Sequence, residues 1–305
     1  MPHPSSSLIE IANLSTTQID SLFLSAIDFS KESPAKKTDS VSFKCKTIAL
    51  LFFEASTRTR FSFETAAARL GLHPLLLDGI QGTSLEKGES VEDTVLNIAA
   101  MGPTAMVVRC GDSVDLLRLQ DQVKMPILNA GWGMKGHPSQ ALLDALTMKA
   151  GGRKLQSEKL LVIGDVKHSR VMKSHFALAR ILGYEIAICG PREFLPANYT
   201  DRHFANLDDG LRWATSVMAL RVQHERHGKR YSVESYREEF GLSFTKLKSW
   251  NSDGFIMHPG PVNYGVELET DINQDSRCKI LEQVRWGTYL RQALFANVLS
   301  EGSPC

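Results

Sequence analysis

The segment Ser56–Arg60 carries three hydroxyl groups and two guanidinium groups within five residues. It follows the apolar run Thr47–Phe53 and precedes a helical pattern from about Phe61 to Leu70. Backbone N–H groups and the positive end of a helix dipole would therefore face this loop, and together with the side chains they suit a phosphate group. The segment matches neither a P-loop nor a G-x-G-x-x-G turn, so a nucleotide is not the obvious ligand. An ordinary Ser or Thr helix cap with flanking arginines is the alternative.

Arginines also follow the ends of several other expected strands. In open α/β sheets, ligands bind beyond the carboxyl ends of the strands. A nearly neutral chain with arginines at these positions is suited to hold several anionic groups in one cleft, although any single one has the alternative of a solvated surface arginine. The five are Arg58, Arg60, Arg109, Arg170 and Arg221.

Two segments that begin with histidine offer further chemistry. His137–Gln140 opens a helical pattern. A helix N-terminus disfavours the imidazolium, so a neutral imidazole that donates to a carbonyl oxygen is expected, with a capping or packing histidine as the alternative. His258–Pro261 contains two prolines and cannot continue a helix or a central strand. Its carbonyl groups could bind a substrate ammonium group; a plain turn is the alternative.

The polar loop Gly82–Glu89 is a candidate lid. It has glycines near both ends and Lys87 near its tip, and Ser90 and Asp93 follow in capping-box spacing. The loop could carry the Lys87 ammonium into a site, including a neighbouring subunit's, whereas an exposed lysine is otherwise usually inert. No Ser/His/Asp order, cysteine-nucleophile signature or H-E-x-x-H motif accompanies these segments, so we expect no covalent intermediate, metal or cofactor.

Composition limits the classes of protein. The chain has 305 residues, of which 43% are apolar and 23% charged, a balance typical of folded globular proteins large enough for two domains with a cleft between them. A formal charge of +1 gives no reason to expect a nucleic-acid or acidic-membrane partner. No apolar run approaches the ~20 residues of a membrane helix, and the N-terminus lacks a signal-peptide pattern, so a cytoplasmic location is expected. Five scattered cysteines predict neither disulfides nor a zinc site.

Short apolar runs alternate with helical patterns along the chain, which predicts parallel sheets covered on both faces. The linker-like stretch Ala150–Arg153 suggests a domain boundary. A final helix over about residues 276–299 is long enough to pack back on the first half. The expected strands are Thr47–Phe53, Ala105–Val108, Ile127–Asn129, Lys159–Ile163, Glu185–Cys189, Ser216–Leu220 and Gly254–Met257.

From about Phe52 to the terminal helix, the sequence resembles the catalytic chain of the aspartate carbamoyltransferase family. The resemblance is carried, in order, by FFEASTRTRFSFE, GTSLEKGES, VVRC, GHPSQALLDALT, GDVKHSR, LRVQHER and HPGPVNYGVEL. The Ser-Thr-Arg-Thr-Arg and His-Pro-x-Gln elements are shared by all carbamoyltransferases. The Arg-Val-Gln-x-Glu-Arg and His-Pro-Gly-Pro elements point to aspartate, and the His-Cys-Leu-Pro segment of the ornithine enzymes is absent.

The resemblance implies transfer of a carbamoyl group from carbamoyl phosphate to the α-amine of L-aspartate, an early step of pyrimidine synthesis. Arg58, Thr59, Arg109 and His137 would be the catalytic groups. Ser84 and Lys87 would reach in from the neighbouring subunit of a homotrimer. The carbamoyl phosphate site would comprise Ser56, Thr57, Arg58, Thr59, Arg109, His137, Gln140, Pro259 and Gly260, and the aspartate site Lys87, Arg170, Arg221, Gln223, Gly260 and Pro261, with a cis bond between Gly260 and Pro261.

The implied fold is α/β: two doubly wound domains, each with a mainly parallel sheet flanked by helices, and a C-terminal helix that returns to the first domain. A carbamoyl phosphate domain would span residues 1–136 and 287–305, an aspartate domain residues 150–286, and an interdomain helix residues 137–149. Association with regulatory or dihydroorotase-type chains is left open, as is control by nucleotides.

Four residues depart from the family pattern outside the expected substrate contacts: Ala55, Cys110, Trp132 and Tyr264. They bear on regulation and affinity more than on the reaction. Two alternatives remain: a carbamoyltransferase with another amine acceptor, and a catalytically silent homologue that serves as an assembly partner.

Overall fold

A computed structural model describes residues 7–31, 43, 46–197, 199, 201–222, 232–248, 250 and 253–300. The chain forms two compact units: unit 1 comprises Met1–Leu143 and Val284–Cys305, and unit 2 comprises Asp144–Gln283. Both divisions fall inside helices. The domain boundaries expected from the sequence stay a prediction. Within the described ranges, no helix combines the length and the hydropathy needed to cross a membrane.

Unit 1 is built on a four-stranded parallel sheet in the order β2-β1-β3-β4. Because the strands are parallel, the loops after β1, β3 and β4 leave from the same edge. The strands are β1 (Thr47–Phe52), β2 (His73–Asp78), β3 (Ala105–Cys110) and β4 (Ile127–Trp132); the helical elements are η2 (Ile11–Asn13), α1 (Thr16–Lys31), α2 (Thr57–Arg69), η4 (Ser84–Lys87), α3 (Val91–Ala100), α4 (Leu116–Val123) and parts of α5 (Pro138–Ala150) and α11 (Ile280–Ser300).

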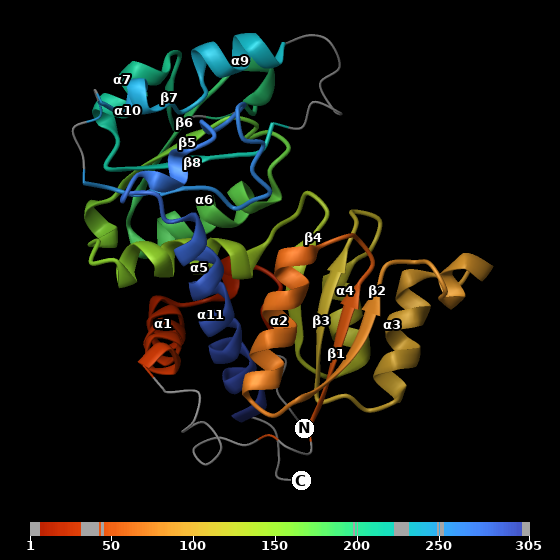
Figure 1. The fold of residues 1–305 in the computed structure, drawn as a ribbon. Coiled ribbons are helices and arrows are strands. Elements are labelled where there is room, and N and C mark those ends of the chain that lie inside the picture. Colours follow the sequence, from red (N-terminus) through yellow and green to blue (C-terminus); the bar gives the residue numbers. More distant parts are fainter. Residues whose placement is uncertain are drawn as a thin grey trace. The chain divides into compact units, whose positions relative to one another are not determined.

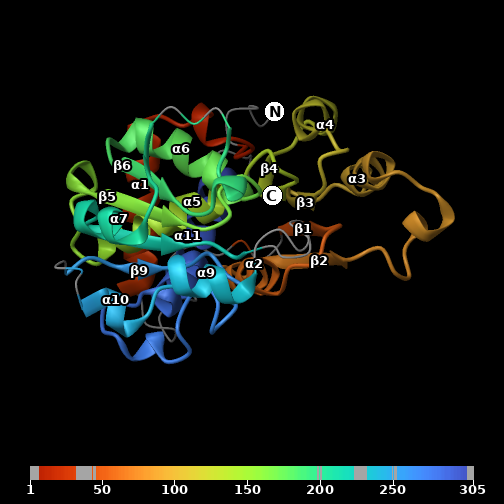
Figure 2. The same ribbon diagram turned by 90° about the horizontal axis from the view of Figure 1, so that it is seen from above.

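Helices cover both faces of this sheet. Figure 2 shows α3 and α4 on one side of the strands and α2 on the other. On the first side, Leu51 and Val108 of the strands share a buried cluster with Val95 of α3 and Leu119 of α4. On the second side, the Phe63 ring of α2 meets the Phe295 ring of α11 edge-on at 5.6 Å. The strands are therefore apolar on both faces, as a doubly wound sheet requires.

Unit 2 repeats the plan with a five-stranded parallel sheet in the order β7-β6-β5-β8-β9. Figure 1 shows α7, α9 and α10 on one side of this sheet and α6 on the other. The strands are β5 (Lys159–Ile163), β6 (Glu185–Cys189), β7 (Arg202–Phe204), β8 (Ser216–Ala219) and β9 (Ile256–Met257); the helical elements are η5 (Leu155–Ser157), α6 (Arg170–Leu182), η6 (Arg192–Phe194), α7 (Leu207–Trp213), α9 (Val233–Glu239), α10 (Phe244–Lys248) and η8 (Ile272–Gln274).

Each strand expected from the sequence is present, and the two-sheet α/β fold is confirmed. Two strands were missed: β2, which contains a proline and lies at a sheet edge, and β7, which has only three residues. The helix expected from Phe61 begins at Thr57. The prediction started too late because the first turn is polar and apolar periodicity does not reveal it. The final helix begins at Ile280, four residues later than expected. The polar stretch Lys31–Ser40 (KESPAKKTDS) also predicts a solvated loop, and its positions 32–40 lie outside the described residues.

Candidate functional site

In unit 1, the phosphate-loop candidate lies where β1 ends and α2 begins. Ser56 is the N-cap of α2, but its side chain makes no capping hydrogen bond, and the first turn contains no acidic residue. The N-terminal amides of α2 are thus not capped by this side chain, and the first turn of the helix supplies no counter-charge to the positive end of its dipole. Such a helix end can accept an anion.

The two arginines of this segment differ in their surroundings. Arg60 is held by carboxylates: its guanidinium contacts Asp78, and its Nε lies 3.4 Å from Glu64 Oε1. Arg58 makes no ion pair or hydrogen bond among the described residues, and loss of hydration lowers the pKa of its guanidinium. Arg58 therefore remains available for an anion. Carboxylates thus already offset the charge of Arg60, and the expectation that the five strand-end arginines serve the site stays a prediction.

Neighbouring strand ends bring further predicted groups to Thr59. Thr59 Oγ1 lies 3.5 Å from His137 Nε2, and both residues are buried. His137 directly precedes α5, where its carbonyl accepts from the backbone N–H of Gln140 at 3.1 Å. Arg109, at the end of β3, donates to the Ala130 carbonyl at 3.4 Å. The loops after β1, β3 and β4 thus assemble the predicted carbamoyl phosphate groups of unit 1 at one edge of the sheet.

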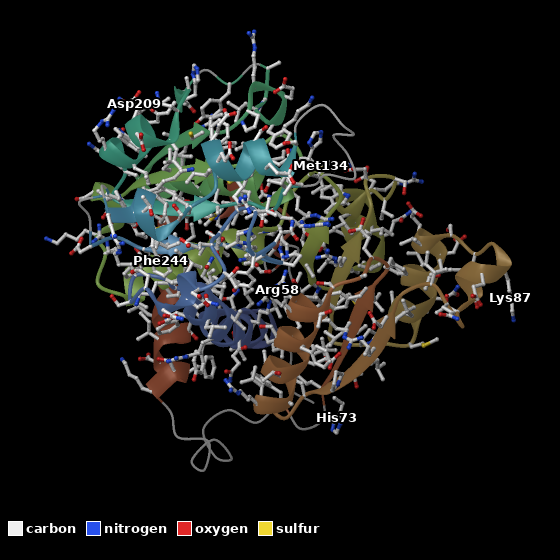
Figure 3. All side chains as sticks on the ribbon, turned by 45° about the horizontal axis from the view of Figure 1, so that its top comes forward. Arg58, His73, Lys87, Met134, Asp209 and Phe244 are labelled. Carbon is white, nitrogen blue, oxygen red and sulfur yellow. The ribbon has the colours of Figure 1, made fainter. Side chains whose placement is uncertain are left out.

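Ser84 and Lys87 are not part of this assembly within their own chain. They form η4, in a segment that projects away from the strands, and Figure 3 shows Lys87 far from Arg58 of the same unit. The adjoining helix α3 is capped as expected, since Ser90 Oγ accepts from the Asp93 backbone N–H at 3.0 Å.

In unit 2, the predicted aspartate-binding groups follow three adjacent strands. Arg170 opens α6 after β5, Arg221 follows β8, and His258–Pro261 follows β9. Because β5, β8 and β9 are neighbours in a parallel sheet, these segments leave from one edge. Gln223 lies outside the described residues.

The segment His258–Pro261 has the expected cis bond between Gly260 and Pro261. Gly260 has a φ of 72°, a left-handed conformation that glycine adopts without strain. His258 Nδ1 accepts from the Gly260 backbone N–H at 2.8 Å. No donor among the described residues contacts the carbonyl groups of Pro259 and Gly260. These carbonyl groups can accept hydrogen bonds from an amine.

Buried polar side chains that sequence reasoning missed surround these unit 2 segments. Gln283 Oε1 accepts from the His258 backbone N–H at 3.0 Å, and Gln283 Nε2 donates to Asp144 Oδ1 at 2.7 Å. The other oxygen of Asp144 lies 3.0 Å from His175 Nε2. Glu267 is also buried here, with its Oε2 3.8 Å from His258 Nε2. Of these buried polar residues, only Glu267 falls in a motif that the sequence analysis singled out, HPGPVNYGVEL.

Family models match almost the whole chain. Residues 6–150 match the aspartate/ornithine carbamoyltransferase, carbamoyl-P binding domain, and residues 156–298 match the aspartate/ornithine carbamoyltransferase, Asp/Orn binding domain. The chain belongs to the aspartate/ornithine carbamoyltransferase family. Within this family, the predicted phosphate loop lies in the carbamoyl-P binding domain, and Arg170, Arg221 and His258–Pro261 lie in the Asp/Orn binding domain.

Solved structures share both the fold and the family. The aspartate transcarbamoylase from Trypanosoma cruzi in complex with carbamoyl phosphate is 25% identical, with a TM-score of 0.82, 96% of this chain and 95% of that chain covered. Its complex with N-(phosphonacetyl)-L-aspartic acid has the same identity and coverage and a TM-score of 0.80. The catalytic subunit of the M. jannaschii aspartate transcarbamoylase is 27% identical, with a TM-score of 0.83 and 97% and 99% coverage.

Proposed function

We propose that this carbamoyltransferase moves the carbamoyl group from carbamoyl phosphate to the α-amine of L-aspartate, releasing phosphate and N-carbamoyl-L-aspartate. Similar structures support the choice of acceptor: the Trypanosoma cruzi enzyme is an aspartate transcarbamoylase that has been solved with carbamoyl aspartate and phosphate, at 25% identity to this chain. The Arg-Val-Gln and His-Pro-Gly-Pro elements support it independently.

The observation that carries the proposal is the environment of Arg58. A cation in the first helical turn is disfavoured by the dipole, yet neither an acidic residue in that turn nor a described ion pair offsets it. A phosphate bound there would neutralise both the guanidinium and the helix end, and would receive backbone N–H groups as well. The leaving group of the reaction would then lie against Ser56, Thr57, Arg58 and Thr59.

The groups next to this loop fit stabilisation of a tetrahedral intermediate. Attack of a neutral amine on the carbamoyl carbon places negative charge on its oxygen, and Thr59, Arg109 and His137 would supply donors to that oxygen, with Gln140 beside the carbamoyl nitrogen. A fixed donor of this kind contributes roughly 3 to 4 kcal/mol in comparable sites. The departing phosphate would take the amine proton, since His137 is assigned here as a donor to the developing oxyanion.

In unit 2, the two carboxylates of aspartate would be bound by Arg170, Arg221 and Gln223. Its amine would donate hydrogen bonds to the carbonyl groups of Pro259 and Gly260, just before Pro261. Two anionic substrates repel each other in water. Paired guanidinium groups offset that repulsion, and fixing both reactants contributes on the order of 7 to 11 kcal/mol to lowering the barrier.

We further propose that the enzyme is a homotrimer whose sites are shared. The Ser84–Lys87 segment points away from its own unit 1 cluster, so it is available to a neighbour. It adjoins an exposed apolar sheet edge at β2, where the Leu75, Leu76 and Ile80 side chains are each about half exposed. Contact with another copy would bury this edge. The cytoplasmic location and the role in pyrimidine synthesis are proposed from the family resemblance of the motifs.

A carbamoyl phosphate assay with aspartate and ornithine as competing acceptors tests the function. We expect N-carbamoyl-aspartate and no citrulline, and formation of citrulline would assign the chain to the other branch of the family. A silent homologue would give neither product. Thermal stabilisation by N-(phosphonacetyl)-L-aspartic acid then shows whether a chain without turnover still binds substrates, and a mass measurement tests the trimer.

A further inference from the structure

The buried carboxylate of Glu267 joins two segments that are distant in sequence. Its Oε1 accepts from the Val222 backbone N–H at 2.7 Å and from Asn263 Nδ2 at 2.9 Å. Its Oε2 accepts from the Asn263 backbone N–H at 2.7 Å. The side chain is 1% exposed. Val222 directly follows Arg221, and Asn263 lies two residues beyond Pro261, so this one carboxylate holds both proposed aspartate-binding segments.

This link begins where the sheet stops. Strands β8 and β9 pair through Val217 with Ile256 and Met218 with Met257, and the described ladder ends there. Strand β8 stays paired with β5 through Ala219, and the Leu220 N–H donates to the Ile163 carbonyl at 2.8 Å, but no described β8–β9 pairing beyond Met257 fixes the spacing of the two segments that follow. Glu267 replaces the missing ladder bonds with two backbone N–H···carboxylate bonds, which are short and charge-assisted.

Charges around the carboxylate strengthen the same arrangement. Burial raises the pKa of Glu267, while the Val222 and Asn263 hydrogen bonds and the positive charge of Arg221 act in the opposite direction. The imidazole of His258 is also close, with Nε2 3.8 Å from Glu267 Oε2. The ionised Glu267 carboxylate thus interacts both with the Arg221–Val222 segment and with the His258–Asn263 segment.

We propose that Glu267 is a positioning residue for aspartate: it sets the spacing between Arg221 and the His258–Pro261 carbonyl groups. The inference rests on the proposed function. A carboxylate suits the position because it only accepts, so each oxygen can face N–H donors. Glutamine has the same shape, but its amide group would turn a donor toward Val222 or Asn263.

The test compares E267Q with E158Q in the full-length protein. Glu158 is the matched control because it is a 2% exposed glutamate in the same unit, and it accepts from Arg153 Nε at 2.6 Å and Ser216 Oγ at 2.7 Å. It precedes β5 and therefore lies at the amino-terminal edge of the sheet, away from the proposed site. Loss of buried hydrogen bonds should lower the melting temperature in both variants.

The Michaelis constants separate positioning from stability. We expect E267Q to raise the KM for aspartate about tenfold or more while the KM for carbamoyl phosphate stays within about twofold, since loss of one charge-assisted bond corresponds to roughly that factor. E158Q should leave both constants near those of the parent enzyme. N263A, which removes only the side-chain bond to Glu267, should shift the aspartate KM about threefold in the same direction and keeps the test available if E267Q does not fold.

An unchanged aspartate KM in the folded variants, or an equal shift in E158Q, would overturn the inference. The parent enzyme separates this from the proposed function. If it makes no N-carbamoyl-aspartate, the function itself is wrong; if it is active and Glu267 variants bind aspartate normally, only the positioning role is wrong.

Discussion

The two units hold their proposed substrate-binding groups by different means. In unit 1, the groups sit directly on regular structure: Thr57–Thr59 form the first turn of α2, Arg109 ends β3, and His137 adjoins α5. In unit 2, Arg221 and His258–Pro261 lie in coil beyond the last paired residues of β8 and β9. Buried side chains, chiefly Glu267 and Gln283, fix that coil.

The difference shows which kind of site depends on which kind of residue. A group on a helix N-terminus is positioned by the helix hydrogen bonds, so only the residue itself is needed for function. A group in coil also needs buried partners that never touch a substrate. We therefore expect that variants of buried residues without substrate contact weaken aspartate binding in unit 2 more than such variants weaken carbamoyl phosphate binding in unit 1.

The largest effect is expected in unit 1, for Arg58→Ala. Its guanidinium would contact the leaving phosphate, and loss of this charged donor should lower kcat by about a hundredfold to a thousandfold. Steady-state kinetics measure this, with circular dichroism to check the fold. Arg60→Ala is the matched control, because Arg60 is engaged by Asp78 and Glu64. Comparable kcat values for the two variants would contradict the distinction between these arginines.

Mixing two inactive variants tests whether the Ser84–Lys87 segment serves the site of a neighbouring chain. Lys87→Ala and Arg58→Ala chains are each expected to be inactive alone. In mixed trimers with shared sites, some sites receive Arg58 from one chain and Lys87 from another, so activity should return. Denaturing the two variants together, refolding them and assaying turnover measures the recovery. No recovery, with trimers present by mass, would argue that each site uses a single chain.

The sequence predicted more of unit 1 than of unit 2. Ser56–Arg60 stood out because an apolar strand, a hydroxyl-rich loop and a helix follow one another directly, so local spacing is sufficient. Glu267 and Asp144 reach their partners only after β8, β9 and α11 are brought together, and no local pattern indicates which carboxylate will be buried beside which amide. Strand β2 was missed for a similar reason, since its exposed leucines and proline are explained only by its place at a sheet edge.

A smaller effect should distinguish two buried glutamines of the same helix. Gln283 bridges Asp144 and the His258 backbone N–H, whereas the Gln292 amide has no hydrogen-bond partner among the described residues. Gln283→Leu leaves a carboxylate and an N–H group without this partner, each at a cost of about 1 to 3 kcal/mol, and should raise the aspartate KM several-fold.

Gln292→Leu should leave the unfolding free energy unchanged or raise it, because it replaces an unsatisfied buried amide with an apolar group of similar size. Urea unfolding of both variants measures the difference. Equal losses of stability would show that the Gln283 hydrogen bonds do not hold the unit 2 coil.

The smallest effect is expected where the core of unit 2 is regular rather than coil. Cys189 ends β6 and is fully buried, and burial raises the pKa of its thiol to about 12. At pH 8, roughly one such thiol in ten thousand is ionised, so iodoacetamide should leave Cys189 unmodified in the native protein and alkylate it after unfolding. Because the folded pKa lies above that of an unfolded thiol, this group's contribution to stability is present at neutral pH and declines as the pH rises toward 12. Peptide mass mapping before and after denaturation gives the readout. Rapid alkylation of the native thiol would mean that the sheet opens locally at β6. The contrast between a rigid strand and a coil held by side chains would then fail for unit 2.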